Sequence, residues 1–528
     1  MTSSRAYIQS CWTQLLHPTA ARWASLFFSL HILTLLISVA ASQAFLAAAA
    51  IAYLIHLLRL RPVARGSRLP RLRDGHPFAK FTLSEANGLR AGSARGREQD
   101  APATAGETPA LRAINFPPVK LPLLLFCLAT FNSVLWAECP ALGGFAVRKL
   151  VLFLILLLSV NLVASVRHLG ALFRGLFFVS ALAGFVGTAQ FVIQYHSVRQ
   201  LHPGHVYYYM TLTRIHGFMG HWMNFGGQQM LLFSALLAFL LASPSRRSPL
   251  SVIPAKAGIQ TPTDVAPRFR GGDSTGDSYL FGLGKSPWSL GLDGKRKGVY
   301  WLLLAVVATS LVLNFTRGAW LGCVVATVYI AARWKPRALW LIPVLLGVAY
   351  LAAPSLIRRR VSLAFHPTDD PALAIRLEMW GAGLRMVREH PWVGVGPENI
   401  PLVYTRYLPP GTTPMAGYHE HLHDNFLQLA AERGLPCLLA WLWFMLALGW
   451  NILRVRRRLS STLWVADAAF AAWLAFSAEG FFEFNFGTSP VLMVFLFVMS
   501  TPFLAEHLES HTQEARVTGT GSGPSLSS

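Results

Sequence analysis

Residues 299–333 read VYWLLLAVVATSLVLNFTRGAWLGCVVATVYIAAR. Two apolar stretches, 299–315 and 318–333, each approach the roughly 20 residues that an α-helix needs to cross a bilayer. Only Thr316 and Arg317 separate them, so the chain reverses where an arginine stands. The pattern predicts two membrane-spanning helices with a charged turn between them.

The composition extends this prediction to the whole chain. Of 528 residues, 53% are hydrophobic and 13% are charged, and the mean hydropathy is +0.43. One soluble core cannot bury so much apolar surface. We therefore predict an all-α, polytopic membrane protein with about 12 transmembrane helices. The predicted spans are residues 24–40, 43–58, 120–136, 148–166, 171–193, 222–242, 299–315, 318–333, 337–354, 434–452, 463–481 and 488–506.

The distribution of Lys and Arg predicts the topology, because these residues stay on the cytoplasmic side of membrane segments. With the amino terminus inside, every even-numbered connection is basic, whereas the odd ones are short and nearly neutral except 194–216 and 355–430. The net charge of +22 therefore comes mostly from the Lys and Arg residues of the predicted cytoplasmic connections. It favours contact with anionic membrane lipid over nucleic acid, since no basic run is interleaved with aromatic residues.

The spans and loops divide the chain into eight segments. The predicted segments are 1–60, the first two transmembrane helices; 61–116, a disordered basic cytoplasmic loop; 117–243, helices three to six; 244–298, a disordered cytoplasmic insertion; 299–354, helices seven to nine; 355–430, a large periplasmic loop with catalytic residues; 431–506, helices ten to twelve; and 507–528, a disordered tail. The two insertions lack apolar periodicity, which is typical of chain without a packed core.

Three predicted spans that run inward from the outer face have an ionisable residue at or just before their first turn: Arg214, Arg317 and His423. A helix amino terminus offers unpaired N–H groups and the positive end of the helix dipole, and an added guanidinium makes it a strong phosphate site. We predict that Arg214 and Arg317 hold the two phosphates of a pyrophosphate. The alternative is that each arginine anchors its helix at the membrane interface.

His423 is the predicted catalytic residue, because an imidazole titrates near neutral pH and can accept a proton from an attacking hydroxyl. The chain predicts no metal site and no cofactor. Asn425, Gln428 and Glu432 return at helical spacing after His423, and they either bind substrate or bond between helices. The other candidate substrate-binding residues are His221 and Asn224, which follow Arg214.

Four blocks resemble a known family. They are TRGAWLG (316–322), RLEMWGAGLRMVREHPWVGVGPENI (376–400), HDNFLQLAAERG (423–434) and EGFFEFNFGTSPVLM (479–493). They are similar, in order, to the signature blocks of the O-antigen ligase and O-antigen polymerase superfamily, and the resemblance covers most of residues 120–506. The ligase pattern has Asn, Ser or Gln after the histidine and ends in Gly, where this chain has Asp424 and Cys437.

The resemblance implies a GT-C-like membrane glycosyltransferase in the bacterial inner membrane, with its active site facing the periplasm. Such an enzyme moves a glycan from undecaprenyl pyrophosphate to an acceptor hydroxyl by an inverting, metal-independent reaction. In a ligase the acceptor is lipid A core, whereas a chain polymerase or a protein O-oligosaccharyltransferase uses another glycan or a protein.

The matched motifs also imply roles for residues. Arg214 and Arg317 would hold the donor pyrophosphate, and His423 would be the base or orienter for the acceptor. Arg376 would lie on an amphipathic helix at about 374–388 that covers the site. Glu479, Glu483 and Asn485 in the last block either bind sugar or serve packing.

Two other classes of protein compete with this interpretation. His419, Glu420 and His423 spell H-E-x-x-H, which on a helix would hold zinc in a membrane metalloprotease. The helix is predicted to begin near Asp424, however, so this spacing falls in extended chain. A polysaccharide transporter would need polar groups at the midplane or broken helices in both halves of the chain, with a repeat between the halves. No convincing repeat occurs in the sequence.

Overall fold

The computed structural model describes residues 20–60, 114–241, 294–366, 368, 370–412 and 421–519. Across these ranges the regular structure is helical, and no strand is found in them. The predicted disordered loops 61–116 and 244–298 lie almost wholly outside the described residues, as do residues 520–528.

The first half of the chain forms a helical segment at residues 20–34 and then α2 to α8. Their bounds are α2 (Val39–Leu60), α3 (Lys120–Leu135), α4 (Pro140–Lys149), η1 (Leu150–Phe153), α5 (Leu154–Leu162), α6 (Val166–Leu201), η2 (Pro203–His205), α7 (Val206–Leu212) and α8 (Trp222–Leu241).

The second half continues from α9 to α17. The bounds are α9 (Gly294–Leu313), α10 (Arg317–Trp334), η3 (Pro336–Trp340), α11 (Leu341–Ala352), α12 (Ser355–Phe365), α13 (Pro371–Glu389), α14 (Ile400–Val403), η5 (Tyr404–Tyr407), α15 (Asn425–Arg456), α16 (Leu463–Glu479), η6 (Asn485–Gly487) and α17 (Ser489–Gly519).

The fold confirms a helical membrane protein. Among the described residues, six helices are long and apolar enough to cross a bilayer: Val39–Leu58, Pro140–Leu162, Val166–Leu201, Trp222–Leu241, Asn425–Arg456 and Ser489–His511. Three shorter apolar helices are Lys120–Leu135, Lys297–Leu313 and Pro336–Ala352. Each predicted span overlaps a helix. Only six of the described helices meet the criteria of length and hydropathy, however, so the count of twelve membrane spans stays a prediction.

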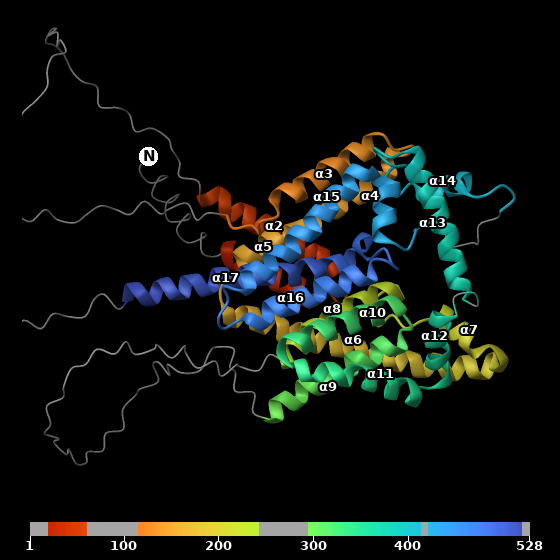
Figure 1. Cartoon of the computed structure of the whole chain (residues 1–528). Coiled ribbons are helices and arrows are strands. Elements are labelled where there is room, and N and C mark those ends of the chain that lie inside the picture. The colour runs from red at the N-terminus through yellow and green to blue at the C-terminus, as the bar shows by residue number, and fades with distance from the viewer. Residues whose placement is uncertain are drawn as a thin grey trace, which may run out of the picture.

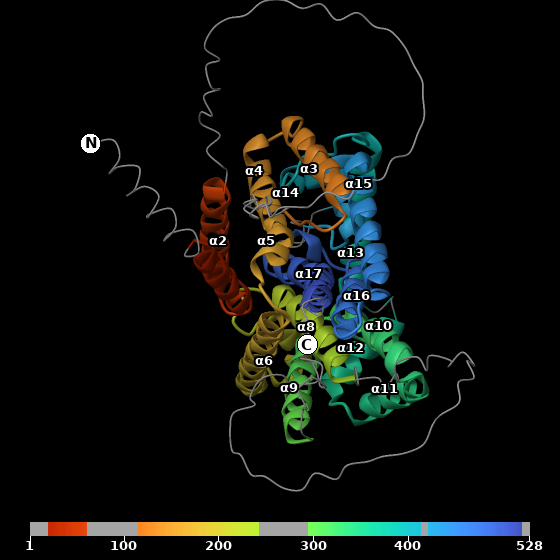
Figure 2. The same cartoon turned by 90° about the vertical axis from the view of Figure 1, so that its left-hand side faces the viewer.

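Helices α8 and α17 lie at the centre of the bundle. Their apolar windows are 78% and 83% buried, against 28% for α2, which stands at the margin beside α5 (Figure 2). A helix that is apolar all round lies either in a protein core or against lipid, and the burial of α8 and α17 places them in the core. Gln228 of α8 is fully buried and donates to the backbone oxygens of Leu35 and Pro490, each at 3.0 Å. Such polar contacts bind helices together inside a bilayer.

Helix α15 is broken near its amino-terminal end, which is the outer end in the predicted topology. Gly434 has φ +80°, and Pro436 two residues later has no N–H to donate. The carbonyls of Ala431 and Glu432 accept hydrogen bonds from outside the helix, which satisfies backbone groups at the break. Helix α15 therefore consists of an outer piece that begins at Asn425 and a longer piece after the break.

The segment after α13 supplies the hydrogen bonds at this break. The N–H groups of Val395 and Gly396 donate to the two carbonyls, both at 2.9 Å, and the Leu435 N–H donates to the Pro391 oxygen at 2.8 Å. Gly394, with φ +68°, approaches so closely that a Cβ there would lie 2.3 Å from the backbone carbon of Glu432. The loop and the broken helix therefore form one unit.

The structure adds helices to one predicted segment and differs from the prediction in another. The predicted loop 355–430 contains α12, α13 and α14 and the start of α15, and α13 includes the amphipathic helix expected at 374–388. Residues 507–519 of the predicted disordered tail continue α17. The physical reason is Glu509, whose carboxylate accepts the backbone N–H of Thr462 at 2.9 Å and holds this end against the start of α16.

Replacing Gly394 with Ala should destabilise the protein by about 1–3 kcal/mol, because the new methyl group meets backbone at a positive φ. The measurement is thermal unfolding of the full chain in detergent. Gly411→Ala is the matched control, since Gly411 also has a positive φ, +81°, but nothing lies within 4 Å of its Cβ position. Equal losses of stability in the two variants would contradict the close packing at the break.

Candidate functional site

The candidate site lies at the end of the bundle where α7, α12, α13 and α14 gather (Figure 1). Helix α10 begins at Arg317, and α15 begins one residue after Asp424, whose side chain accepts the Leu427 N–H at 2.7 Å. Arg376 stands on α13, and Glu483 lies in the connection between α16 and η6. Segments far apart in sequence therefore supply the site.

Glu483 connects the predicted catalytic histidine to a predicted arginine. One carboxylate oxygen lies 2.7 Å from His423 Nδ1, and the other accepts from Arg376 Nη2 at 2.8 Å. Glu483 is 3% exposed, whereas about a fifth of each partner side chain remains accessible. The buried carboxylate therefore orients two groups that both reach the surface of the site.

Positive charge surrounds this carboxylate. Burial raises the pKa of Glu483, but the His423 hydrogen bond and the charges of His423, Arg376 and Arg214 outweigh it, so the pKa lies below its usual value. Glu483 is therefore ionised at neutral pH. An ionised carboxylate at Nδ1 favours the imidazole tautomer in which Nδ1 carries the proton and Nε2 can accept one.

Arg317 is held by a second carboxylate. Its Nη2 donates to Asp370, which also caps α13 by accepting the Ala372 N–H at 3.3 Å. Asp370 thus connects the amino-terminal ends of α10 and α13. Gly318, the next residue of α10, packs against the Glu483 side chain, with 3.7 Å from its Cβ position to Cγ. This packing places Arg317 beside the pair of His423 and Glu483.

Arg360 adds another guanidinium to this end of the molecule. Its Nε donates to the Phe315 oxygen at 3.1 Å, and it is 7% exposed. Burial lowers the pKa of Arg360, and the nearby positive charge of Arg317 lowers it further. An anion between these groups would relieve that repulsion.

Arg214 approaches the same cluster from the segment before α8. Its Nε donates to the Thr211 oxygen at 2.8 Å, and its guanidinium lies 3.9 Å from the ring centroid of Trp222. This stacking fixes the side chain at the start of α8. The structure therefore brings Arg214, Arg317 and Arg376 together around Glu483, although it does not test their predicted roles.

The polar stripe on α15 is buried and hydrogen-bonded inside the protein. Asn425, Gln428 and Glu432 are each at most 2% exposed. Asn425 donates to Asn485 at 2.6 Å, and Gln428 donates to Glu432 at 2.9 Å. The geometry favours the alternative in which these three residues support the site from inside the protein.

Asn485 belongs to the same buried network. Its side chain donates to Glu479 at 3.0 Å and to the Phe476 oxygen at 3.1 Å, which fixes the chain just after Glu483. The two other predicted substrate-binding residues lie at the start of α8. His221 is exposed and accepts the Met223 N–H at 3.2 Å, and Asn224 is half-buried on the first turn.

The sequence motifs predict no site role for Asp370 or Arg360, and they predict either sugar binding or packing for Glu483. A signal existed for Asp370, because an Asp followed by Pro371 is typical of a helix start. No comparable signal existed for Arg360, which lies on an amphipathic helix where arginine is usual. Its role depends on a tertiary contact with the turn before Arg317.

The zinc-binding alternative depends mostly on His419 and Glu420, which lie outside the residues that the structure describes. His423 has φ +50° and precedes the first residue of α15, so it is not on that helix. Within the described ranges, no group of three His, Cys, Asp or Glu side chains could hold a metal ion.

A bundle of apolar helices with histidine, carboxylate and arginine groups at one end defines a membrane protein with a polar site at its surface. Residues 302–442 match the family model described as O-antigen ligase. This segment includes Arg317, Arg376 and His423, and the match supports the resemblance of the chain to the O-antigen ligase and polymerase superfamily. None of the curated proteins matches the chain significantly.

Replacing Glu483 with Gln should lower stability at pH 7, because Arg376 loses its counter-charge and His423 Nδ1 loses its carboxylate partner. The folded-state pKa of Glu483 is depressed, so its stabilising contribution is complete above its usual value of 4.5 and is lost as pH falls through the lower folded value. The difference in unfolding temperature between wild type and Glu483→Gln should shrink below pH 4.5. A difference that stays constant from pH 7 to pH 3 would contradict the ion-pair assignment.

Proposed function

We propose that this chain transfers a glycan from undecaprenyl pyrophosphate to an acceptor hydroxyl on the periplasmic side of the bacterial inner membrane. The main support is the Glu483 carboxylate, which lies 2.7 Å from His423 Nδ1 and accepts a hydrogen bond from Arg376 at 2.8 Å. It does so beside the start of α10. The family match of residues 302–442 supports the same conclusion. The proposed acceptor is lipid A core, as in an O-antigen ligase.

His423 is the proposed base. With Nδ1–H donated to Glu483, Nε2 accepts the proton of the acceptor hydroxyl as that oxygen attacks the anomeric carbon of the donor. The bond from this carbon to the pyrophosphate oxygen breaks, and the electron pair leaves with the lipid pyrophosphate. Attack from the face opposite the leaving group inverts the anomeric carbon. No metal or cofactor enters this scheme.

The arginines are the proposed pyrophosphate-binding groups. Arg317, Arg360 and Arg376 carry three positive charges, and the carboxylates that face them in the described cluster are Asp370 and Glu483. The excess positive charge favours an anion and stabilises the charge that grows on the departing phosphate. Planar guanidinium groups also suit phosphate geometry better than ammonium groups.

The topology agrees with catalysis on the outer face. Basic residues follow each even-numbered predicted span, which places the ends that carry Arg214, Arg317 and His423 on the periplasmic side. This assignment depends on the nine predicted spans that precede His423. Cysteine labelling from the periplasm at positions 205 and 366, which lie on exposed segments at the site end, tests it directly.

His423→Ala should lower transfer roughly 100-fold or more, the usual contribution of a general base. Arg317→Gln should lower it roughly 100- to 1,000-fold by removing charge stabilisation. The measurement is transfer to purified acceptor by the full-length protein in detergent or vesicles. The matched controls are His366→Gln, directly after α12, and Arg388→Gln on α13; both residues are exposed and both variants should retain activity. Near-normal transfer by His423→Ala would refute its role as base.

Gene deletion distinguishes the ligase from the polymerase. Loss of all lipid A-linked polymer with accumulation of lipid-linked chains is the expected result for a ligase. Caps of a single repeat unit would instead identify a chain polymerase, and unchanged lipopolysaccharide with loss of protein-bound glycan would identify a protein O-oligosaccharyltransferase. The measurement is electrophoretic profiling of surface polysaccharide and glycoprotein in the deletion strain and in a complemented strain.

A further inference from the structure

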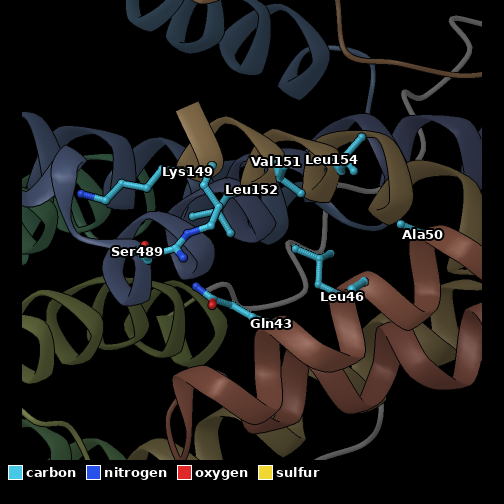
Figure 3. A pocket seen from close by; sticks show the side chains of 10 residues that line it. Gln43, Leu46, Ala50, Lys149, Val151, Leu152, Leu154 and Ser489 are labelled. Atoms are coloured by element: carbon cyan, nitrogen blue, oxygen red, sulfur yellow. The ribbon is translucent and has the colours of Figure 1, made fainter. Parts of the chain in front are cut away.

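A second concave feature lies away from the arginine cluster, between α2 and the α4–η1–α5 segment. Its volume is about 190 Å³. Figure 3 shows Leu46, Ala50, Val151 and Leu154 toward one end, with Gln43 and Ser489 at the other end, close to each other. Ala47, Arg148, Lys149 and Leu152 complete the lining. The groove is therefore apolar along its length and polar at one end.

The sequence explains why the helices do not close this space. Gln43, Ala47 and Ala50 lie on one face of α2, because residues three or four apart are neighbours on a helix, and two of the three are small. Opposite them the chain changes from α4 to the 3₁₀ turn η1. Val151 is 52% exposed and Leu154 is 36% exposed, so the groove opens to the side of the bundle, where lipid would surround it.

The polar end carries an excess of positive charge. Lys149 Nζ is neutralised by Glu398 at 2.7 Å. Arg148 is exposed, and its guanidinium lies 5.2 Å from the centroid of the Phe145 ring, which does not balance its charge. Arg148 also lies within the candidate span Pro140–Leu162, where an ionisable residue is costly unless it binds a partner. The pattern is cationic and hydrogen-bonding at one end and apolar beyond it.

We propose that this groove binds an anionic phospholipid, with its phosphate on Arg148 and one acyl chain along Leu46, Ala50 and Val151. Gln43 and Ser489 donate hydrogen bonds to the phosphodiester or glycerol oxygens. Basic pockets between transmembrane helices recognise lipid phosphate in this way. This site is separate from the arginine cluster and does not depend on the proposed glycosyl transfer.

The size of the groove selects a phospholipid over a glycan-bearing lipid. Pockets that enclose a drug-sized molecule measure roughly 300–1,000 Å³, and 190 Å³ is smaller than that range. A phosphodiester headgroup and the first part of one chain fit such a space, but an oligosaccharide does not. In the predicted topology this end of α2 faces the periplasm, so the occupant belongs to the periplasmic leaflet.

The test is native mass spectrometry of the full-length protein in detergent, titrated with dioleoyl-phosphatidylglycerol or dioleoyl-phosphatidylcholine. The wild type should retain phosphatidylglycerol preferentially. Arg148→Gln should lower its apparent affinity about tenfold, the value of one charge-assisted hydrogen bond. Arg167→Gln, at an exposed position at the start of α6, is the matched control and should bind like the wild type. Ala50→Phe, which fills the apolar part of the groove, should also lower the affinity for phosphatidylglycerol.

Three results would overturn the proposal. They are equal retention of phosphatidylglycerol by Arg148→Gln and Arg167→Gln, equal retention of the two phospholipids by the wild type, and co-purification of a polyprenyl phosphate that phosphatidylglycerol does not displace. Should Arg148→Gln misfold, Ala50→Phe keeps the guanidinium and still reports on the groove. Thermal unfolding of each variant identifies misfolding.

Discussion

One buried carboxylate organises the site. Glu483 holds an imidazole with one oxygen and a guanidinium with the other, and it is almost fully removed from water. A buried charge is tolerated only when its partners are close and well oriented. The Glu483 carboxylate therefore constrains the side chains of both His423 and Arg376. His423 comes from the start of α15 and Arg376 from α13. Glu483 therefore fixes the relative position of two helices as well as the tautomer of the imidazole.

The backbone around Glu483 is held from inside the protein. Asn425 contacts Asn485 through its side chain and donates its own N–H to the Gly480 oxygen at 2.8 Å. These bonds connect the first residue of α15 to both sides of the connection that carries Glu483. The same region packs tightly, since a Cβ at Gly480 would lie 2.3 Å from the Asn425 side chain. The geometry of the histidine and carboxylate pair thus depends on residues that do not reach the site themselves.

The sequence predicts much of the fold because membrane helices follow from apolar length and from the cost of misplaced charge. The expected spans at 222–242 and 318–333 coincide closely with α8 and α10. The site is partly predictable for the same reason: Arg214, Arg317 and His423 stand where a bilayer makes charge costly, and the structure gathers them. The exact partners are not predictable, because the contacts of Arg317 with Asp370 and of His423 with Glu483 join residues 53 and 60 positions apart.

The chain between Glu398 and Leu422 is clamped at both ends on the outer piece of α15. The Glu398 N–H donates to Glu432 at 3.0 Å, and the Leu422 N–H donates to Gln428 at 2.7 Å. The cost of closing a loop grows only slowly with its length, so insertions between these clamps are inexpensive. The exposed residues 409–412 can therefore accept insertions while the hydrogen bonds of Glu398 and Leu422 keep His423 in place.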